Sequence, residues 1–143
     1  MKKTTIVSGL AVLMILSLTL IPGMGITADI YETLPGQGKK CPIGKDYYFT
    51  YSFDKKPQLG TIILKIELFD KDGKKDTSLA ITGDSGMPSM KGHHDSGEAE
   101  FRLNKKSEYL LPVSVVMPGD WEVKLVFKKD NNPIYRASIK FDI

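Results

Sequence analysis

The sequence predicts an all-β fold: an immunoglobulin-like antiparallel β-sandwich of about seven strands, preceded by an N-terminal signal peptide. Three observations support this prediction. Short segments between residues 46 and 143 alternate apolar and polar side chains with a period of two, turn-forming residues recur about every eight to twelve residues, and no segment has the spacing of an amphipathic helix. This pattern is typical of a sandwich domain, with a small open barrel as the alternative.

Residues 1–28 are predicted to be a signal peptide. Lys2 and Lys3 form a basic start, residues 6–21 are almost entirely apolar, and the small residue Ala28 closes a segment that suits cleavage. The apolar run of 16 residues is shorter than the roughly 20 that span a bilayer. Cleavage and export to the periplasm or the extracellular side are therefore expected. The alternative is an uncleaved anchor that holds the domain outside the cytoplasm.

Charge and cysteine content narrow the class of protein further. The net charge of +3 falls to +1 once Lys2 and Lys3 are removed, so the composition gives no reason to expect nucleic acid binding. Cys41 is the only cysteine, which excludes a disulfide within the chain. In an oxidising compartment it is a buried free thiol, an intermolecular pairing site or an additional metal ligand.

The first half of the mature chain predicts three strands after an irregular leader segment at residues 29–45, which proline and glycine interrupt. Four aromatic residues share one face of residues 47–53, as in a half-buried strand. Residues 62–69 alternate in the same way and end at an Asp-Gly turn. Residues 77–81 are expected to return beside them as the third strand. The β-sandwich domain itself is predicted over residues 46–143.

The second half predicts four strands and a long polar loop at residues 83–97. Pro112 lies inside one of the strands, and because proline donates no hydrogen bond to a ladder, that strand is expected at a sheet edge or with a bulge. Residues 130–133 are predicted to close a hairpin. The four strands are expected at residues 99–103, 109–117, 121–127 and 135–141.

The segment from Gly86 to His94 carries the strongest indication of function. It holds Met87, Met90, His93 and His94 inside a loop that is otherwise polar. Thioether sulfur and imidazole nitrogen are soft and borderline ligands, so this set suits Cu(I), and the histidines alone would suit Cu(II). The alternatives to a metal site are methionines that fill gaps under the loop, or a protein contact surface.

The spacing of these residues suggests how a site would form. A turn at Pro88-Ser89 would let the sulfurs of Met87 and Met90 converge. In extended backbone, the adjacent His93 and His94 would point to opposite sides, which favours one of them as a ligand.

Met117 is the further candidate, because it ends a strand of the sandwich. Its alternative is a core methionine. Trp121 is expected in the core rather than over a cation. A zinc site is disfavoured because no closed set of cysteine and histidine ligands exists.

No paired carboxylates, phosphate loop or cofactor motif is found in the sequence, so the protein is not expected to be an enzyme. Asp70, Asp72 and Gly73 fit a hairpin turn better than a calcium loop, since Lys74 follows them.

Two short motifs carry a family resemblance. The stretch Met87-Pro88-Ser89-Met90 with His93-His94 is followed by Met117-Pro118-Gly119-Asp120-Trp121-Glu122-Val123. From about Leu59 to the C-terminus, the chain resembles the periplasmic domain of FixH and YtkA-like proteins. The resemblance implies an immunoglobulin-like sandwich outside the cytoplasmic membrane and a link to copper handling or cytochrome oxidase assembly. FixH proteins keep their N-terminal anchor, whereas this segment looks cleavable.

The sequence therefore predicts an exported, non-enzymatic protein that binds copper. Met87, Met90 and His93 are the preferred ligands, followed by His94 and Met117. Its expected role is to carry or buffer copper, or to deliver it to a membrane partner such as a cytochrome oxidase. The alternative is a structural or protein-interaction module of the cell envelope without a metal.

Overall fold

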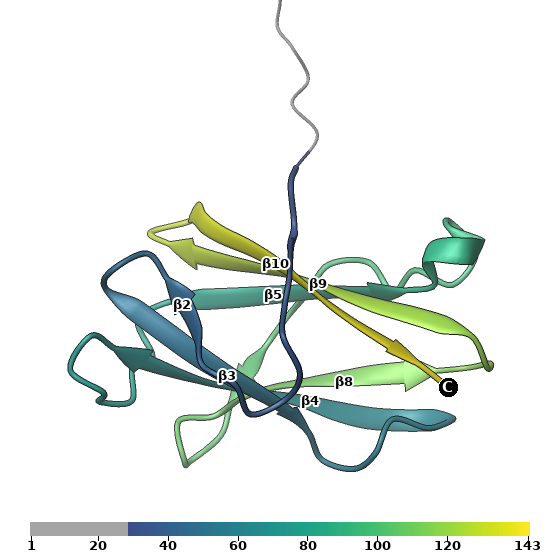
Figure 1. Cartoon of the computed structure of the whole chain (residues 1–143), viewed down its shortest axis with the longest axis horizontal. Coiled ribbons are helices and arrows are strands. Elements are labelled where there is room, and N and C mark those ends of the chain that lie inside the picture. Colours follow the sequence, from purple (N-terminus) through teal and green to yellow (C-terminus); the bar gives the residue numbers. More distant parts are fainter. Residues whose placement is uncertain (1–28) are drawn as a thin grey trace, which may run out of the picture.

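The computed structural model describes residues 29–143, and the predicted signal peptide, residues 1–28, lies outside them. The described residues form two five-stranded sheets packed face to face (Figure 1). The predicted all-β, immunoglobulin-like sandwich is confirmed. One sheet has the order β1-β10-β9-β5-β6 and the other β2-β3-β4-β8-β7. The elements are β1 (Glu32–Thr33), β2 (Cys41–Ile43), β3 (Tyr47–Phe53), β4 (Gly60–Asp70), β5 (Ala80–Gly86), a 3-10 turn η1 (Pro88–Met90), β6 (Ala99–Glu100), β7 (Arg102–Leu103), β8 (Tyr109–Val115), β9 (Asp120–Lys129) and β10 (Asn132–Asp142).

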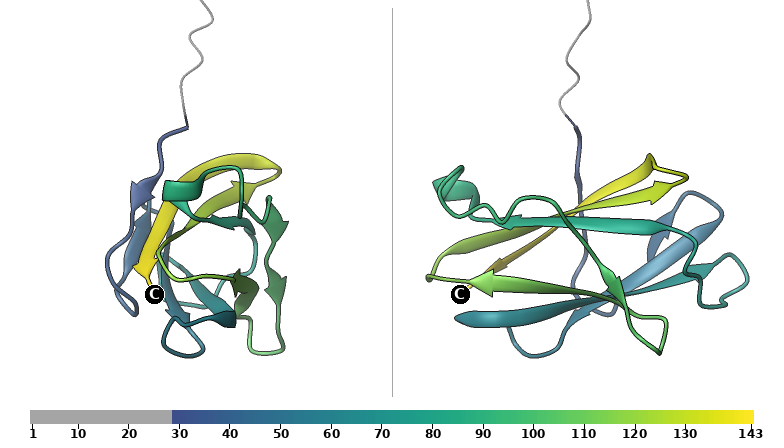
Figure 2. Two further views of the ribbon diagram at one scale, coloured as in Figure 1. Left: turned by 90° about the vertical axis from the view of Figure 1, so that its right-hand side faces the viewer. Right: turned by 180° about the vertical axis from the view of Figure 1, so that it is seen from behind.

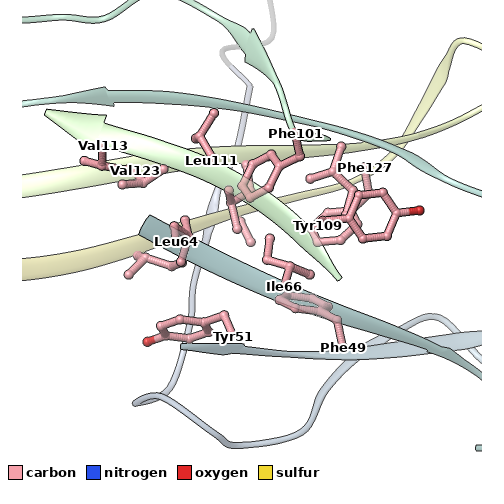
Figure 3. Close-up of a cluster of buried hydrophobic side chains, with 14 of the residues drawn as sticks. Phe49, Tyr51, Leu64, Ile66, Phe101, Tyr109, Leu111, Val113, Val123 and Phe127 are labelled. Atoms are coloured by element: carbon pink, nitrogen blue, oxygen red, sulfur yellow. The ribbon is translucent and has the colours of Figure 1, made fainter. Parts of the chain in front are cut away.

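The core lies between the two sheets and is built by the alternating apolar residues of the long strands (Figure 3). Phe49 of β3 and Phe127 of β9 meet across it with their ring centroids 4.6 Å apart. Trp121 is also buried, as predicted. A fully buried side chain of this size contributes about 1.5–3 kcal/mol. Both sheets and this core are built from residues 29–143, which correspond to the predicted mature chain.

The proline in β8 lies at a sheet edge, as the sequence predicts. Pro112 pairs with Ile63 of β4 on one side. On the other side, β7 pairs only with Tyr109 and Leu110. The missing proline N–H therefore leaves no gap in the ladder.

The prediction that residues 77–81 return as a strand beside residues 62–69 is wrong. The turn after β4 does form, with the Asp70 amide donating to the Lys74 carbonyl (2.9 Å), but a single bridge between Phe69 and Lys75 is all that pairs after it. Strand β3 covers one edge of β4, and β8 covers the other as far as Ile66, so only the last residues of β4 are free for the returning chain. The chain instead crosses to the other sheet, where β5 pairs with β9.

Two further predictions need correction. The strand expected at residues 99–103 is divided, because β6 pairs with β5 in one sheet and β7 pairs with β8 in the other, with Phe101 buried between them. The leader at residues 29–45 is not wholly irregular, since β1 joins β10 and β2 joins β3. The hydroxyl of Tyr51 also donates to the Pro35 carbonyl (2.6 Å) and ties the leader to β3.

The predicted hairpin at residues 130–133 is confirmed between β9 and β10. Asp130 and Asn131 both have positive φ, 49° and 65°, which suits a tight turn that follows the twist of the sheet. Among residues 29–143, no helix has the length and apolar character needed to cross a membrane.

Gly83 provides a test of the packing between the sheets. A Cβ there would lie 2.6 Å from Leu111 Cδ2 and 3.0 Å from the ring of Phe101, both buried. Gly83→Ala is expected to lower the free energy of unfolding by about 1–3 kcal/mol, because the core is already filled. Gly36→Ala is the control, since nothing lies within 4 Å of its added Cβ. Chemical denaturation measures both, and equal stabilities would contradict the tight packing of the two sheets at this position.

Tyr109 provides a test by pH. Its buried hydroxyl donates to the Leu79 carbonyl (2.6 Å), and burial raises the pKa of Tyr109 to about 12. Its contribution to stability is complete below the unfolded pKa of about 10 and is lost as the pH rises from about 10 to 12. Tyr109→Phe should cost about 1–3 kcal/mol at neutral pH, because the carbonyl loses its donor. The variant should also lose less stability than the native protein when denaturation is repeated above pH 10.

Candidate functional site

Three segments meet at one end of the sandwich, on the right-hand side of Figure 1. Strand β5 ends opposite the start of β9, with Gly86 paired to Glu122, so the Met and His segment begins beside the turn that precedes β9. Strand β4 starts beside the end of β8, with Gly60 paired to Val115. We call residues 54–59, 86–96 and 116–119 the methionine end. Figure 2 shows it facing the viewer on the left and from behind on the right.

Met87 is buried rather than part of an exposed loop. Its side chain is 3% exposed and belongs to the hydrophobic core cluster. A Cβ on Gly119 would lie 2.7 Å from Met87 Cε, so the glycine permits the methionine to pack against the 116–119 turn. Gly119 also has a φ of 138°, which other residues rarely adopt.

Met90 and Met117 are half-buried and pack against the same core cluster. The structure thus brings all three methionines of residues 29–143 to one end of the sandwich, although Met117 lies 30 positions beyond Met87 in sequence. Such packing also satisfies the alternative of core methionines, so the arrangement is compatible with either role. The ligand assignment of Met87, Met90 and Met117 stays a prediction.

Backbone and side-chain hydrogen bonds hold the η1 turn in place. The Met90 amide donates to the Met87 carbonyl (3.0 Å), and the His93 amide donates to the Met90 carbonyl (3.1 Å). The Ser89 amide donates to Asp120 Oδ2 (3.1 Å), and the Ser89 hydroxyl donates to the other oxygen of the same carboxylate. Asp120 therefore fastens the turn after β5 to the start of β9.

A second set of bonds holds the far side of the segment. The Ser96 amide donates to the Ser85 carbonyl (2.8 Å), and the Ser85 amide donates to the Ser96 hydroxyl oxygen (2.9 Å). The Gly92 amide donates to Asp95 Oδ2 (3.0 Å), across the two histidines. The segment is therefore anchored on both sides of its histidines.

His93 is exposed and lies in a turn, and His94 is half-buried and lies in a bend, so neither histidine belongs to a strand. The preference for a single histidine ligand assumed extended backbone, in which the two side chains point to opposite sides, and the structure does not have this geometry here. Both remain predicted ligands on the solvent side of the methionine end.

A pocket of about 240 Å³ opens beside Met87, on the outer face of the β5 and β9 pair. Carboxylates of Asp84, Asp95 and Glu122 line it together with Lys91 and Lys124. A Cβ on Gly86 would collide with the Asp95 carboxylate, so this glycine leaves room for the acidic side chain. Sequence reasoning missed this pocket, because only the β5–β9 register brings Asp84 and Glu122 onto the same part of the sheet.

Within residues 29–143, no group of three or more histidine, cysteine, aspartate or glutamate side chains is arranged to hold a metal ion. The pocket carboxylates therefore do not form a cage for a hard cation.

Cys41 is a buried free thiol, and burial raises its pKa. It pairs with Phe49, which in turn pairs with Leu68 of β4. The methionine end lies at Gly60, eight residues back along β4, or about 26 Å at the rise of a strand. Cys41 therefore lies too far away to be an additional ligand at the methionine end. The structure shows it as a buried free thiol.

The end of the chain also contributes to the methionine end. Gly119 and Ile143 exchange two backbone hydrogen bonds, of 3.2 and 3.1 Å. The indole N–H of Trp121 donates to the Met117 carbonyl (3.0 Å), which gives this buried ring a structural role.

The contact between Ser89 and Asp120 can be tested by titration. The Ser89 hydroxyl hydrogen bond, together with backbone amides, lowers the pKa of Asp120. The contact should be complete above the ordinary carboxyl pKa and should be lost as the pH falls through the lowered value. The NMR shift of the Ser89 amide should follow this titration and should lose it in Asp120→Asn. Asp72→Asn, in an exposed turn elsewhere, should leave it unchanged.

The comparisons with known proteins show the fold. No family model and no curated protein matches the chain, so membership of the FixH and YtkA-like family stays a prediction. A similar structure is that of FetP from uropathogenic E. coli strain F11, which was expressed recombinantly in the periplasm of E. coli. The match has a TM-score of 0.50 and 11% sequence identity, and it covers 75% of this chain and 93% of FetP. A copper-bound variant of the same FetP gives a TM-score of 0.47 at 11% identity, over 73% of this chain and 97% of that chain. At this identity the chain shares its sandwich fold with FetP.

Proposed function

We propose that the protein is an exported, non-enzymatic β-sandwich that binds copper at its methionine end. One observation carries this proposal: all three methionines of residues 29–143 lie at one end of the sandwich on two separate segments, and both histidines belong to one of these segments. Packing alone does not require this, because leucine or isoleucine would fill the same space.

The donor set favours Cu(I). Thioethers are soft, uncharged ligands that bind Cu(I) and release it readily to a partner. Burial of Met87 places its sulfur away from water, next to the η1 turn that Asp120 fastens. His93 and His94 lie on the solvent side, where imidazole would complete the coordination or accept Cu(II).

The proposed role follows from this chemistry and from the predicted signal peptide. An exported protein with a weak, exchangeable copper site is suited to carry or buffer the ion. Delivery to a membrane protein such as a cytochrome oxidase is the role that the FixH and YtkA-like resemblance suggests.

A second candidate function is a structural or protein-interaction module of the cell envelope. It is favoured by the burial of Met87 and the packing of Met90 and Met117 against the core, which a structural role explains without a metal. In that case the methionines only fill the end of the core.

Anaerobic Cu(I) titration of residues 29–143 against a competing chelator separates the two functions. The Met87→Leu, Met90→Leu, Met117→Leu triple variant keeps the volume of the core but removes every thioether. Cu(I) affinity should fall by more than roughly 100-fold, because loss of ligands exceeds the roughly 10–100-fold effect of residues that only support them. The titration is done in a Cys41→Ala background so that the thiol does not bind the ion.

Two controls sharpen this experiment. Cys41→Ala alone should bind Cu(I) as the native chain does, because the thiol lies at a distance from the methionine end. His93→Asn with His94→Asn should weaken Cu(II) binding more than Cu(I) binding. If the triple leucine variant and the Cys41→Ala protein bind Cu(I) with equal affinity, the proposed copper function is contradicted and the interaction module is favoured.

A further inference from the structure

Two exposed apolar residues, Leu59 and Val116, flank the last paired residues of β4 and β8 at the methionine end. Gly60 pairs with Val115, so Leu59 and Val116 occupy the next position across β4 and β8. Their side chains are 53% and 60% exposed. The other strongly exposed large apolar residues are Ile30 ahead of β1, Leu103 in β7 and Ile134 in β10, so they lie on separate parts of the chain.

Two lysines precede Leu59 in the turn between β3 and β4. Lys55 and Lys56 are exposed, and within residues 29–143 neither has a carboxylate at salt-bridge distance. Asp54, the nearest acid in sequence, accepts a hydrogen bond from the Ile63 amide (2.7 Å). The tips of two adjacent turns thus present two apolar side chains and two unpaired ammonium groups.

We propose that these two turn tips, residues 55–59 and 116, form a docking surface for an anionic lipid bilayer. Leu59 and Val116 enter the interfacial region of the bilayer, while Lys55 and Lys56 bind the phosphates of the headgroups. The combination of apolar tip and flanking lysines is complementary to a surface that is apolar inside and negatively charged outside.

Other occupants fit this surface less well. A second copy of the chain on a two-fold axis would bring the same lysines against each other, which is repulsive. A protein partner would find only two exposed apolar side chains, far less than the roughly 800 Å² per partner that stable protein interfaces bury. A soluble polyanion would bind the lysines but would gain nothing from Leu59 and Val116.

Docking would turn the methionine end toward the membrane, because Met117 directly follows Val116. The proposal does not rest on copper binding, since its four residues are separate from the predicted ligands. Failure of one proposal therefore leaves the other standing.

Co-sedimentation of residues 29–143 with lipid vesicles tests the proposal at low salt. Binding is expected to vesicles of phosphatidylglycerol and phosphatidylcholine, and not to vesicles of phosphatidylcholine alone. Lys55→Gln with Lys56→Gln should weaken binding about fivefold per lysine, at about 1 kcal/mol for each charge. Leu59→Ser with Val116→Ser should also weaken it severalfold and should leave thermal unfolding nearly unchanged.

Matched variants elsewhere on the surface provide the control. Leu103→Ser with Ile134→Ser and Lys105→Gln with Lys106→Gln remove exposed apolar and basic side chains from other positions, and they should bind vesicles as the native domain does. The proposal is overturned if the domain does not bind phosphatidylglycerol vesicles, or if the control variants lose as much binding. It is also overturned if Leu59→Ser with Val116→Ser has no effect, which would indicate a polyanion site instead.

Discussion

Seven residue pairs join β5 to β9 in antiparallel register, from Ala80 and Lys128 to Gly86 and Glu122, and the position of the methionine end depends on this ladder. Strand β8 occupies the second edge of β4 as far as Ile66, so the chain bridges back only once after the turn at residues 70–74 and then leaves this sheet. The ladder then carries β5 toward the start of β9. Because the two strands run in opposite directions, the segment after β5 meets the turn before β9.

The same contacts serve stability and the proposed chemistry. Met87 fills the end of the core and touches the 116–119 turn, so its removal would open a cavity as well as remove a ligand. The sulfur also lies where hydrogen bonds to Asp120 hold the backbone still. A ligand fixed by packing loses little freedom when a metal binds, which favours binding without new structure. This is why a substitution to leucine, rather than to alanine, distinguishes the two roles.

The sequence predicted the local features of this fold well and the long-range ones poorly. Alternation identified β3, β4, β9 and β10, since the side chains of a strand show directly which face is buried. It did not show which sheet each strand joins, and residues 77–81 were therefore placed beside the wrong partner. Phe101 shows the same limit, because its buried side chain suits either sheet and the chain changes sheets at that residue.

For the candidate site, the sequence identified the residues but not their surroundings. Met117 is a candidate in the sequence because it ends a strand and begins the second motif of the family resemblance, and the β5–β9 register is what brings the neighbouring Gly119 against Met87. The pocket formed by Asp84, Asp95 and Glu122 had no signal in the sequence, because its carboxylates come from three segments.

The pairing of Gly119 with Ile143 has a practical consequence for anyone who handles the protein. Any residue added after Ile143 leaves the sandwich beside the 116–119 turn, within reach of the methionine end. A histidine affinity tag there would place several competing imidazoles next to the predicted ligands and imitate a copper site of its own. A tag ahead of Asp29 enters the fold beside β1 and β10 instead, which makes that end the suitable place for purification handles.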